Sequence, residues 1–223
     1  MIGLSVIIPT LNEEDCIRIA IKSAKKLNPL EIIVVDGGST DRTREIAEGE
    51  GAIVIESPRG RGTQLNRGAS IAKGDILLFL HADSAIPDRV DLKNYLSSKL
   101  SGGFFRLKFD DTSISTRLVE SFANLRAGLF SLPYGDQAIF IKKEVFERLG
   151  GFKEYPFLED LEFVIRLRRF GRLKCLPHEI IASSRRLKKG YPLSPVFVSL
   201  RNVLIVLLFF LGISPYRLQR FYR

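Results

Sequence analysis

The sequence is poor in the residues that build disulfide and zinc frameworks. Its 223 residues include no tryptophan, one methionine, two histidines and two cysteines. Cys16 and Cys175 form no CxxC pair, which argues against a disulfide framework or a zinc site and favours a reducing compartment. The first apolar run, LSVIIP, has no basic leader and continues into NEED, so we expect no signal peptide.

Two common nucleotide-binding signatures are also missing. GxGxxG does not follow the first apolar run, which disfavours a nicotinamide oxidoreductase, and the GK(S/T) of a P-loop is absent. There is no recognisable nucleic-acid-binding motif and no basic patch interleaved with aromatic residues. We therefore expect no nucleic-acid partner.

Positive charge and apolar residues are abundant. The chain has 34 Lys and Arg against 25 Asp and Glu, a net charge of +9, and 45% of its residues are hydrophobic. A chain of this length and composition can bury the core of one domain. The charge predicts an anionic partner, which is a phosphorylated small molecule, an anionic membrane or nucleic acid, and does not choose among them.

The first hundred residues alternate between short Ile- and Val-rich runs and helix-length segments. This alternation is typical of βαβ units, so we predict an α/β fold with a largely parallel sheet. The predicted strands are 4–8, 31–35, 52–55 and 75–80, and the helices between them are 13–27, 41–50 and 62–72. Further on, we predict strands 102–109 and 137–142, a helix at 115–129, and a short helix that ends at Leu149.

Ligands of such sheets bind at the carboxyl ends of the strands, where DGGSTD follows the second strand. There Asp36 is placed to accept hydrogen bonds from a ribose or a base. Gly37 and Gly38 allow a tight turn, and Ser39 or Thr40 is expected to cap the next helix. A purely structural turn with a helix cap is the alternative for this motif by itself.

Two further motifs follow the third and fourth strands. In SPRGRGTQLNRGA, Arg59 and Arg61 stand among glycines before a helix, a pattern suited to gripping a pyrophosphate; a solvated basic loop is the alternative. In HADS, Asp83 ends a buried strand, where a divalent cation is a natural partner for its carboxylate, and His81 could support that metal. A turn-capping aspartate is the alternative for Asp83.

The segment LEDLEFVIRLRRFG, residues 158–171, predicts an amphipathic helix that begins with an acidic cluster at Glu159, Asp160 and Glu162. A carboxylate at a helix start is stabilised by the helix dipole. Acidic residues that simply suit a helix start explain Glu162, and they explain Asp160 less well once the other motifs are considered.

These motifs together resemble the family-two glycosyltransferases with the GT-A fold, a mixed sheet flanked by helices. The resemblance covers about residues 3–175 and rests on SVIIPTLNEE, VVDGGSTDRT, LNRGA, HAD in place of DxD, GDQAIFIKKEVFERLGGFKE and LEDLEFVIRLRRFG, in that order. It implies transfer of one sugar from a nucleotide-diphosphate sugar, with inversion and a divalent Mg²⁺ or Mn²⁺ cofactor.

The resemblance also implies roles for single residues. Asp160 is at the position of the catalytic base, with Glu159 beside it, and Asp83, with His81 nearby, is at the position of the metal ligand. The residues implied for the nucleotide pocket are Pro9, Glu13, Asp36, Asn66 and Gly68.

The chain departs from the family pattern at two motifs. His81 replaces the first acidic residue of DxD, which affects metal strength or identity more than activity. The acceptor motif QxxRW has no counterpart beyond SSRRL at 183–187, which argues against a processive polymer synthase. Arg185 or Arg186 could still contact the diphosphate.

The carboxyl end is apolar and basic. We predict a transferase domain over residues 1–190 and a separate segment over 191–223, which includes the apolar run 203–213. That run is too short to span a membrane, and its basic flanks suit a helix in the headgroup region. The alternatives are a helix packed on the domain or in a homodimer interface.

This carboxyl end favours a lipid acceptor over a small soluble one, and a cytoplasmic enzyme at the inner face of the cell membrane. A different class of function stays open, namely a partner subunit that binds the nucleotide sugar without turnover. The presence of both Asp83 and Asp160 argues against it.

Overall fold

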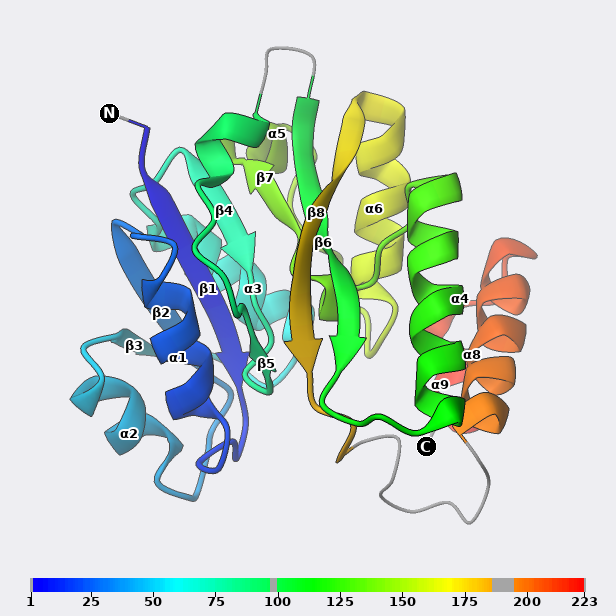
Figure 1. The fold of residues 1–223 in the computed structure, drawn as a ribbon, viewed down its shortest axis with the longest axis horizontal. Helices are drawn as coiled ribbons and strands as arrows, with labels where there is room; N and C mark the ends of the chain where they lie inside the picture. The colour runs from blue at the N-terminus through cyan, green and yellow to red at the C-terminus, as the bar shows by residue number, and fades with distance from the viewer. Residues whose placement is uncertain (1, 97–99, 186–194, 223) are drawn as a thin grey trace.

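A computed structural model describes residues 2–96, 100–185 and 195–222 (Figure 1). One eight-stranded mixed sheet, in the order β3-β2-β1-β4-β7-β6-β8-β5, crosses the domain. The predicted α/β class is therefore confirmed. Its strands are β1 (Leu4–Thr10), β2 (Glu31–Asp36), β3 (Ile53–Glu56), β4 (Ile76–Phe79), β5 (Ser84–Ala85), β6 (Leu100–Phe109), β7 (Phe140–Lys142) and β8 (Arg172–Ala182).

The parallel half of the sheet comes from the four apolar runs predicted at the amino end. β1 pairs in parallel with β2 and β4, and β2 with β3, while β7 lies antiparallel between β4 and β6. β8 is parallel to β6, and the short β5 is antiparallel to β8. The carboxyl ends of β1, β2 and β4 thus share one edge of the sheet, where the polar motifs were expected to gather.

Helices cover both faces of the sheet. They are α1 (Ile17–Lys25), α2 (Thr43–Gly49), α3 (Arg61–Ile71), α4 (Ile114–Phe130), α5 (Lys143–Arg148), α6 (Glu159–Phe170), α8 (Pro195–Phe210) and α9 (Pro215–Tyr222), with short 3₁₀ turns η1 (Leu92–Tyr95) and η2 (Gly135–Gln137). Successive side chains of β1 enter opposite faces. Ile8 packs with Ile17 of α1, and Ile7 packs in a second core with Leu65 of α3 and Phe163 of α6.

Several predicted boundaries are wrong at polar turns. The first helix begins at Ile17, not at residue 13, because the carbonyl of Glu13 already accepts the turn hydrogen bonds of Cys16 and Ile17. Ser39 and Thr40 do not cap α2, since their side chains bind Asp36 and Asn12. The predicted strand at 137–142 begins only at Phe140, after η2.

The long strand β8 was not predicted. Its buried and exposed residues do not alternate regularly, and Pro177 interrupts the pattern that a sequence reader would use. Its pairing with β6 shifts register at Phe104–Arg106. Such an irregularity, which changes the face of the following side chains, obscures the period of two.

The carboxyl end folds as two helices rather than one apolar segment. Gly212, at φ 88°, allows the turn between α8 and α9. Ile205 of α8 and Leu218 of α9 pack with Phe157 of the main domain. The expected boundary between residues 190 and 191 lies outside the described residues. None of the helices in the described part of the chain is both long and apolar enough to cross a bilayer.

Gly68 holds α3 close to the sheet. A Cβ at this position would lie 2.5 Å from Ile7 Cγ2 and 2.9 Å from Val35 Cγ2. Gly68→Ala is therefore expected to lower the free energy of unfolding by about 1–3 kcal/mol through overpacking. Urea denaturation measures this change.

Gly128 of α4 offers the matched control, since a Cβ there meets no atom within 4 Å. Gly128→Ala should stabilise the protein by up to about 1 kcal/mol through helix propensity alone. Equal stabilisation by both substitutions would show that α3 does not need the close approach.

Candidate active site

A cation from the far end of the chain lies among the carboxylates at the sheet edge. Arg185, which follows β8, forms ion pairs with Glu13 after β1 and with Asp83 after β4, the latter at 3.5 Å between Nη2 and Oδ2. Both carboxylate side chains are less than 10% exposed. Buried carboxylates require such a partner, so Arg185 balances the charge of this edge.

Asp36 closes the turn that follows β2. Its Oδ2 accepts the N–H groups of Gly38 at 3.0 Å and Ser39 at 2.9 Å, and its Oδ1 accepts the hydroxyl groups of Ser39 and Thr10. The residue is fully buried. Asp36 therefore stabilises the turn after β2, as expected from the structural alternative given for DGGSTD.

Asp160 lies at the first turn of α6 and faces η2. Its Oδ2 accepts the N–H of Gly135 at 2.6 Å and its Oδ1 accepts the N–H of Leu161 at 2.7 Å. A Cβ on Gly135 would lie 2.8 Å from His81 Nε2 and 3.1 Å from Asp160 Oδ2. The HAD and LED motifs therefore meet at Gly135, where any larger residue would require His81 or Asp160 to shift.

Glu159 points to a different partner from Asp160. Its carboxylate is 1% exposed and pairs with Arg61 at the start of α3, at 3.2 Å between Oε1 and Nη1. Burial raises the pKa of Glu159, and the Arg61 guanidinium opposes that shift. The structure thus joins two predicted site residues in an ion pair that ties α3 to α6.

Glu162, the third member of the acidic cluster, is structural. It pairs with Arg166, whose guanidinium also donates to the carbonyls of Leu149 and Gly151, and with Lys153. The cluster of three carboxylates thus divides into two ion-paired residues and Asp160, which accepts hydrogen bonds from the backbone N–H groups of Gly135 and Leu161.

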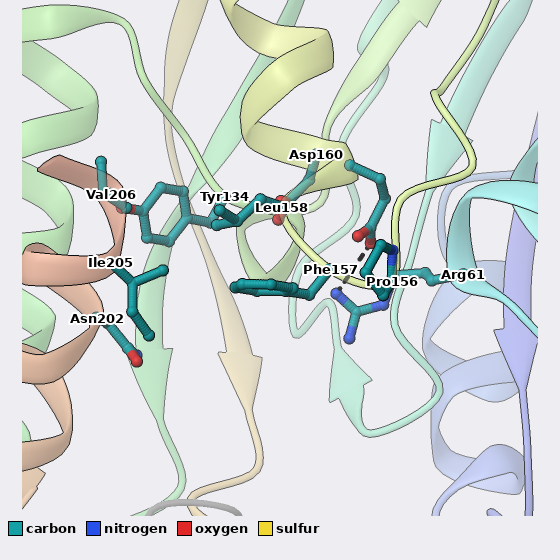
Figure 2. Close-up of a pocket in the computed structure, with 10 residues that line it drawn as sticks. Arg61, Tyr134, Pro156, Phe157, Leu158, Asp160, Asn202, Ile205 and Val206 are labelled. Atoms are coloured by element: carbon teal, nitrogen blue, oxygen red, sulfur yellow. Dashed lines mark hydrogen bonds and ion pairs between the residues drawn. The ribbon is translucent and has the colours of Figure 1, made fainter. Parts of the chain in front are cut away.

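A cavity of about 240 Å³ opens beside Asp160 (Figure 2). Figure 2 shows Arg61 on one side of it and the α8 side chains on the other, with Phe157 between them. Arg126 Cζ lies 3.4 Å from the centre of the Tyr134 ring and so holds that ring in the wall. The complete lining is Arg61, Tyr134, Pro156, Phe157, Leu158, Glu159, Asp160, Asn202, Ile205 and Val206.

Asp136 is a candidate site residue that the sequence interpretation missed. It lies in η2 next to Gly135, and its Oδ1 is shielded from solvent without a hydrogen-bond partner among the described residues. Burial raises the pKa of Asp136 to about 6; Arg126 opposes the shift, and the carboxylates of Asp160 and Asp83 add to it. The sequence signal that could have identified Asp136 is its position in GDQ, at the start of the family motif GDQAIFIKKEVFERLGGFKE.

The raised pKa of Asp136 predicts a pH-dependent stability. The folded protein holds this proton from the ordinary value of 3.8 up to about 6, so the favourable contribution is present in acid and is lost as pH rises through 6. The shift corresponds to about 3 kcal/mol. Asp136→Asn should therefore unfold at higher urea concentration than wild type at pH 7.5 in EDTA.

That advantage should shrink as the pH falls towards 4, because the wild-type carboxyl is then protonated. Urea titrations of both proteins at several pH values measure this. An advantage of equal size at every pH would mean that the Asp136 charge is not the cause.

Other predicted nucleotide residues lie apart from this cluster. The Asn66 amide binds the backbone N–H and C=O of Phe152, both at 2.8 Å, and Gly68 packs against β1 and β2. Arg59 is exposed on the loop before α3, and Pro9 is half-buried in β1. Asn66 and Gly68 thus make packing contacts, and their place in the far wall of the nucleotide pocket stays a prediction.

The carboxylates at the sheet edge suit a hard divalent cation that is held partly by substrate phosphates, rather than one held by protein side chains alone. No group of three or more His, Cys, Asp or Glu side chains suited to a metal occurs in the described residues. Mg²⁺ is commonly held by one or two carboxylates together with substrate phosphates, so a full cage is not required. Asp83 supplies carboxylate oxygens of the right chemistry. The carboxylate of Asp136 interacts electrostatically with Asp83, and its Oδ1 has no hydrogen-bond partner among the described residues.

The mixed sheet, with carboxylates at the ends of its parallel strands, matches the GT-A fold expected from the sequence. Residues 5–98 match the model of the glycosyl transferase family 2. A PGL/p-HBAD biosynthesis glycosyltransferase of Mycobacterium tuberculosis is 31% identical in an alignment of 180 positions that covers 73% of this chain and 68% of that protein. The chain therefore belongs to glycosyl transferase family 2.

Solved structures agree on the fold. A mannosyltransferase from Pyrobaculum calidifontis, solved with GDP-Man and Mn²⁺, gives a TM-score of 0.67 at 21% identity over 89% of this chain. The chain spans 59% of that protein's length. Glucosyl-3-phosphoglycerate synthase from Mycobacterium tuberculosis, solved with Mn²⁺, UDP and glucosyl-3-phosphoglycerate, gives 0.63 at 23% identity, over 95% of this chain and 81% of that one. The GT-A fold is thus confirmed.

Proposed function

We propose that the protein transfers one sugar, with inversion and with the help of Mg²⁺ or Mn²⁺, from a nucleotide-diphosphate sugar to an acceptor hydroxyl or carboxylate. The observation that carries the proposal is the meeting of HAD and LED at Gly135, with Asp160 at the wall of a cavity. A donor bound at the strand ends would have its anomeric carbon beside a positioned base.

The donor is proposed to lie over Glu13, Asp36 and Asp83. Arg185 is ion-paired with Glu13 and Asp83 at this edge and is suited to bind the diphosphate bidentately once it turns from these carboxylate partners. Asp83 would hold the divalent cation, with Asp136 and His81 close to that ligand. The cation would neutralise charge on the departing diphosphate.

Asp160 is proposed to be the base. It removes the proton of an acceptor hydroxyl as that oxygen bonds to the anomeric carbon from the face opposite the diphosphate. The bond between the anomeric carbon and the diphosphate oxygen breaks, and its electron pair leaves on the nucleoside diphosphate. Two backbone donors fix the carboxylate, and Glu159 holds Arg61 beside it.

The acceptor is proposed to be a lipid or a lipid-linked molecule. Half of the cavity wall is apolar, with Phe157, Ile205 and Val206 close to Asp160. The free state of Cys16 and Cys175 suits the cytoplasm. We place the enzyme there, at the inner face of the cell membrane.

Nucleoside diphosphate release from a panel of UDP-, GDP- and dTDP-sugars tests this function, with Mn²⁺ and with EDTA. We expect one donor to be consumed only with metal, and NMR of the transfer product to show inverted anomeric configuration. Donor binding without turnover under a broad acceptor screen would instead support the partner-subunit function. A product with retained configuration would remove Asp160 from the role of base.

A further inference from the structure

Helix α4 carries an apolar stripe that faces away from the protein. Its large side chains recur at intervals of three and four residues, which places them along one side of the helix. All are between 47% and 82% exposed, and they are Ile114, Leu118, Phe122, Leu125 and Leu129. The sequence predicted this helix and did not predict that its apolar side would be left uncovered.

Helix α8 carries a second stripe of the same kind. Ile205 faces the domain and is 2% exposed, whereas the opposite side is at least half exposed along its length. The outward residues are Leu200, Val203, Leu204, Leu207 and Phe210. α4 and α8 pack against each other and run side by side in Figure 1. We call the two stripes together the α4/α8 face.

The charged residues of α8 and α9 are all basic, whereas Asp110 is exposed just before α4. The sequence contains no aspartate or glutamate after Glu179. On α9, Arg217 and Arg220 are exposed next to exposed Tyr216 and Phe221. The acidic residue of α4, Glu120, is buried and accepts the backbone N–H of Phe109. An apolar surface whose carboxyl-terminal helices carry only basic charge complements an anionic lipid leaflet.

We infer that the α4/α8 face docks on an anionic membrane surface, with both helices lying along the leaflet. Contiguous exposed apolar patches of this kind are uncommon on soluble monomers and mark interaction sites. The basic border of α9 would repel its own copy across a symmetric contact, which disfavours a homodimer through this face.

The position of the cavity suggests that docking brings the acceptor to Asp160; this inference rests on the proposed function. The inner side of α8 lines the cavity through Asn202, Ile205 and Val206, and its outer side belongs to the α4/α8 face. One helix thus separates Asp160 from the leaflet. An acceptor whose hydroxyl lies at the headgroup level would reach the base from the membrane side.

Vesicle flotation tests the docking without donor or acceptor, so its outcome is independent of turnover. We expect wild type to float with vesicles of phosphatidylcholine and phosphatidylglycerol, and less with phosphatidylcholine alone or at high salt. The double variant Phe122→Glu, Leu125→Glu should lower the partition coefficient at least tenfold. The circular dichroism spectrum should match that of wild type, which shows that the variant is folded. The rate of metal-dependent donor hydrolysis should also be unchanged, because the proposed donor site does not include this face.

Ile19→Glu is the matched control, because Ile19 of α1 is 60% exposed on another part of the surface. It should float like wild type. Absence of wild-type binding to anionic vesicles, or equal binding by the α4 variant, would overturn the inference. So would light scattering that shows a wild-type dimer which the α4 variant converts to a monomer without any vesicle binding.

Discussion

Asp160→Asn is expected to lower sugar transfer by about a hundredfold to ten-thousandfold while leaving donor affinity within a few fold of wild type. The amide keeps the shape of the side chain, and its single oxygen can still accept one of the two N–H groups, from Gly135 or from Leu161. It cannot take the proton of the acceptor. The loss should therefore appear in kcat for transfer, measured by release of nucleoside diphosphate with a saturating donor.

Glu154→Gln provides the control, since Glu154 is exposed in the segment just before α6 and its side chain forms none of the site contacts. It should transfer at the wild-type rate. If Asp160→Asn kept more than a tenth of the activity, Asp160 would not be the base. Glu159 would then be the next candidate for the base. Testing it requires a Glu159 variant that stays folded after the loss of its ion pair with Arg61.

Asp83→Asn is expected to abolish the stabilisation that metal and nucleotide give together. A ligand at a hundred times its Kd raises the free energy of unfolding by about 2.7 kcal/mol, so the thermal shift of wild type with Mn²⁺ and the correct nucleoside diphosphate should be plain. Removing one charged ligand oxygen from Asp83 should reduce that shift to the level seen in EDTA. Transfer should fall with it.

Asp88→Asn tests whether any acidic residue of the same loop would have this effect. Its side chain is 61% exposed and lies 3.9 Å from His178 Nδ1, away from Arg185. The metal-dependent shift should be unchanged in this variant. A full shift in Asp83→Asn would mean that the cation binds elsewhere or that nucleotide binding needs no cation at this edge.

The sequence predicted the features that repeat or that stand at the end of an element. The four apolar runs all form strands of the parallel half of the sheet, and Asp83 and Asp160 lie where a strand end and a helix start place them. These predictions depend on local patterns, namely the period of apolar residues and the position of a polar residue after them.

What the sequence could not provide are contacts between distant segments. Arg185 and Glu13 are 172 residues apart, and no local pattern pairs them. Asp136 is a single acidic residue in a short turn; its place in GDQ was a weak local signal, and its burial close to the charges of Asp160 and Asp83 is seen only in the structure. Ser39 and Thr40 were wrong as helix caps because Asp36 and Asn12 compete for their hydroxyl groups.

The uncovered side of α4 belongs to the same category. Helical spacing places Phe122 and Leu125 on one side, but which side is covered depends on the position of α8. Asn66 and Gly68 show the converse case. Both match a motif, and the packing of α3 against the sheet and against Phe152 accounts for the contacts that they make.

The position of the metal tests the central claim most directly. Crystals soaked with Mn²⁺ and the nucleoside diphosphate that stabilises the protein should give an anomalous difference peak about 2.1 Å from a carboxylate oxygen of Asp83, with the diphosphate bound to the same ion. The nucleotide's base should lie over the turn closed by Asp36. A peak remote from Asp83 under saturating nucleotide, or bound nucleotide away from the ends of β1, β2 and β4, would contradict the assignment of the donor site.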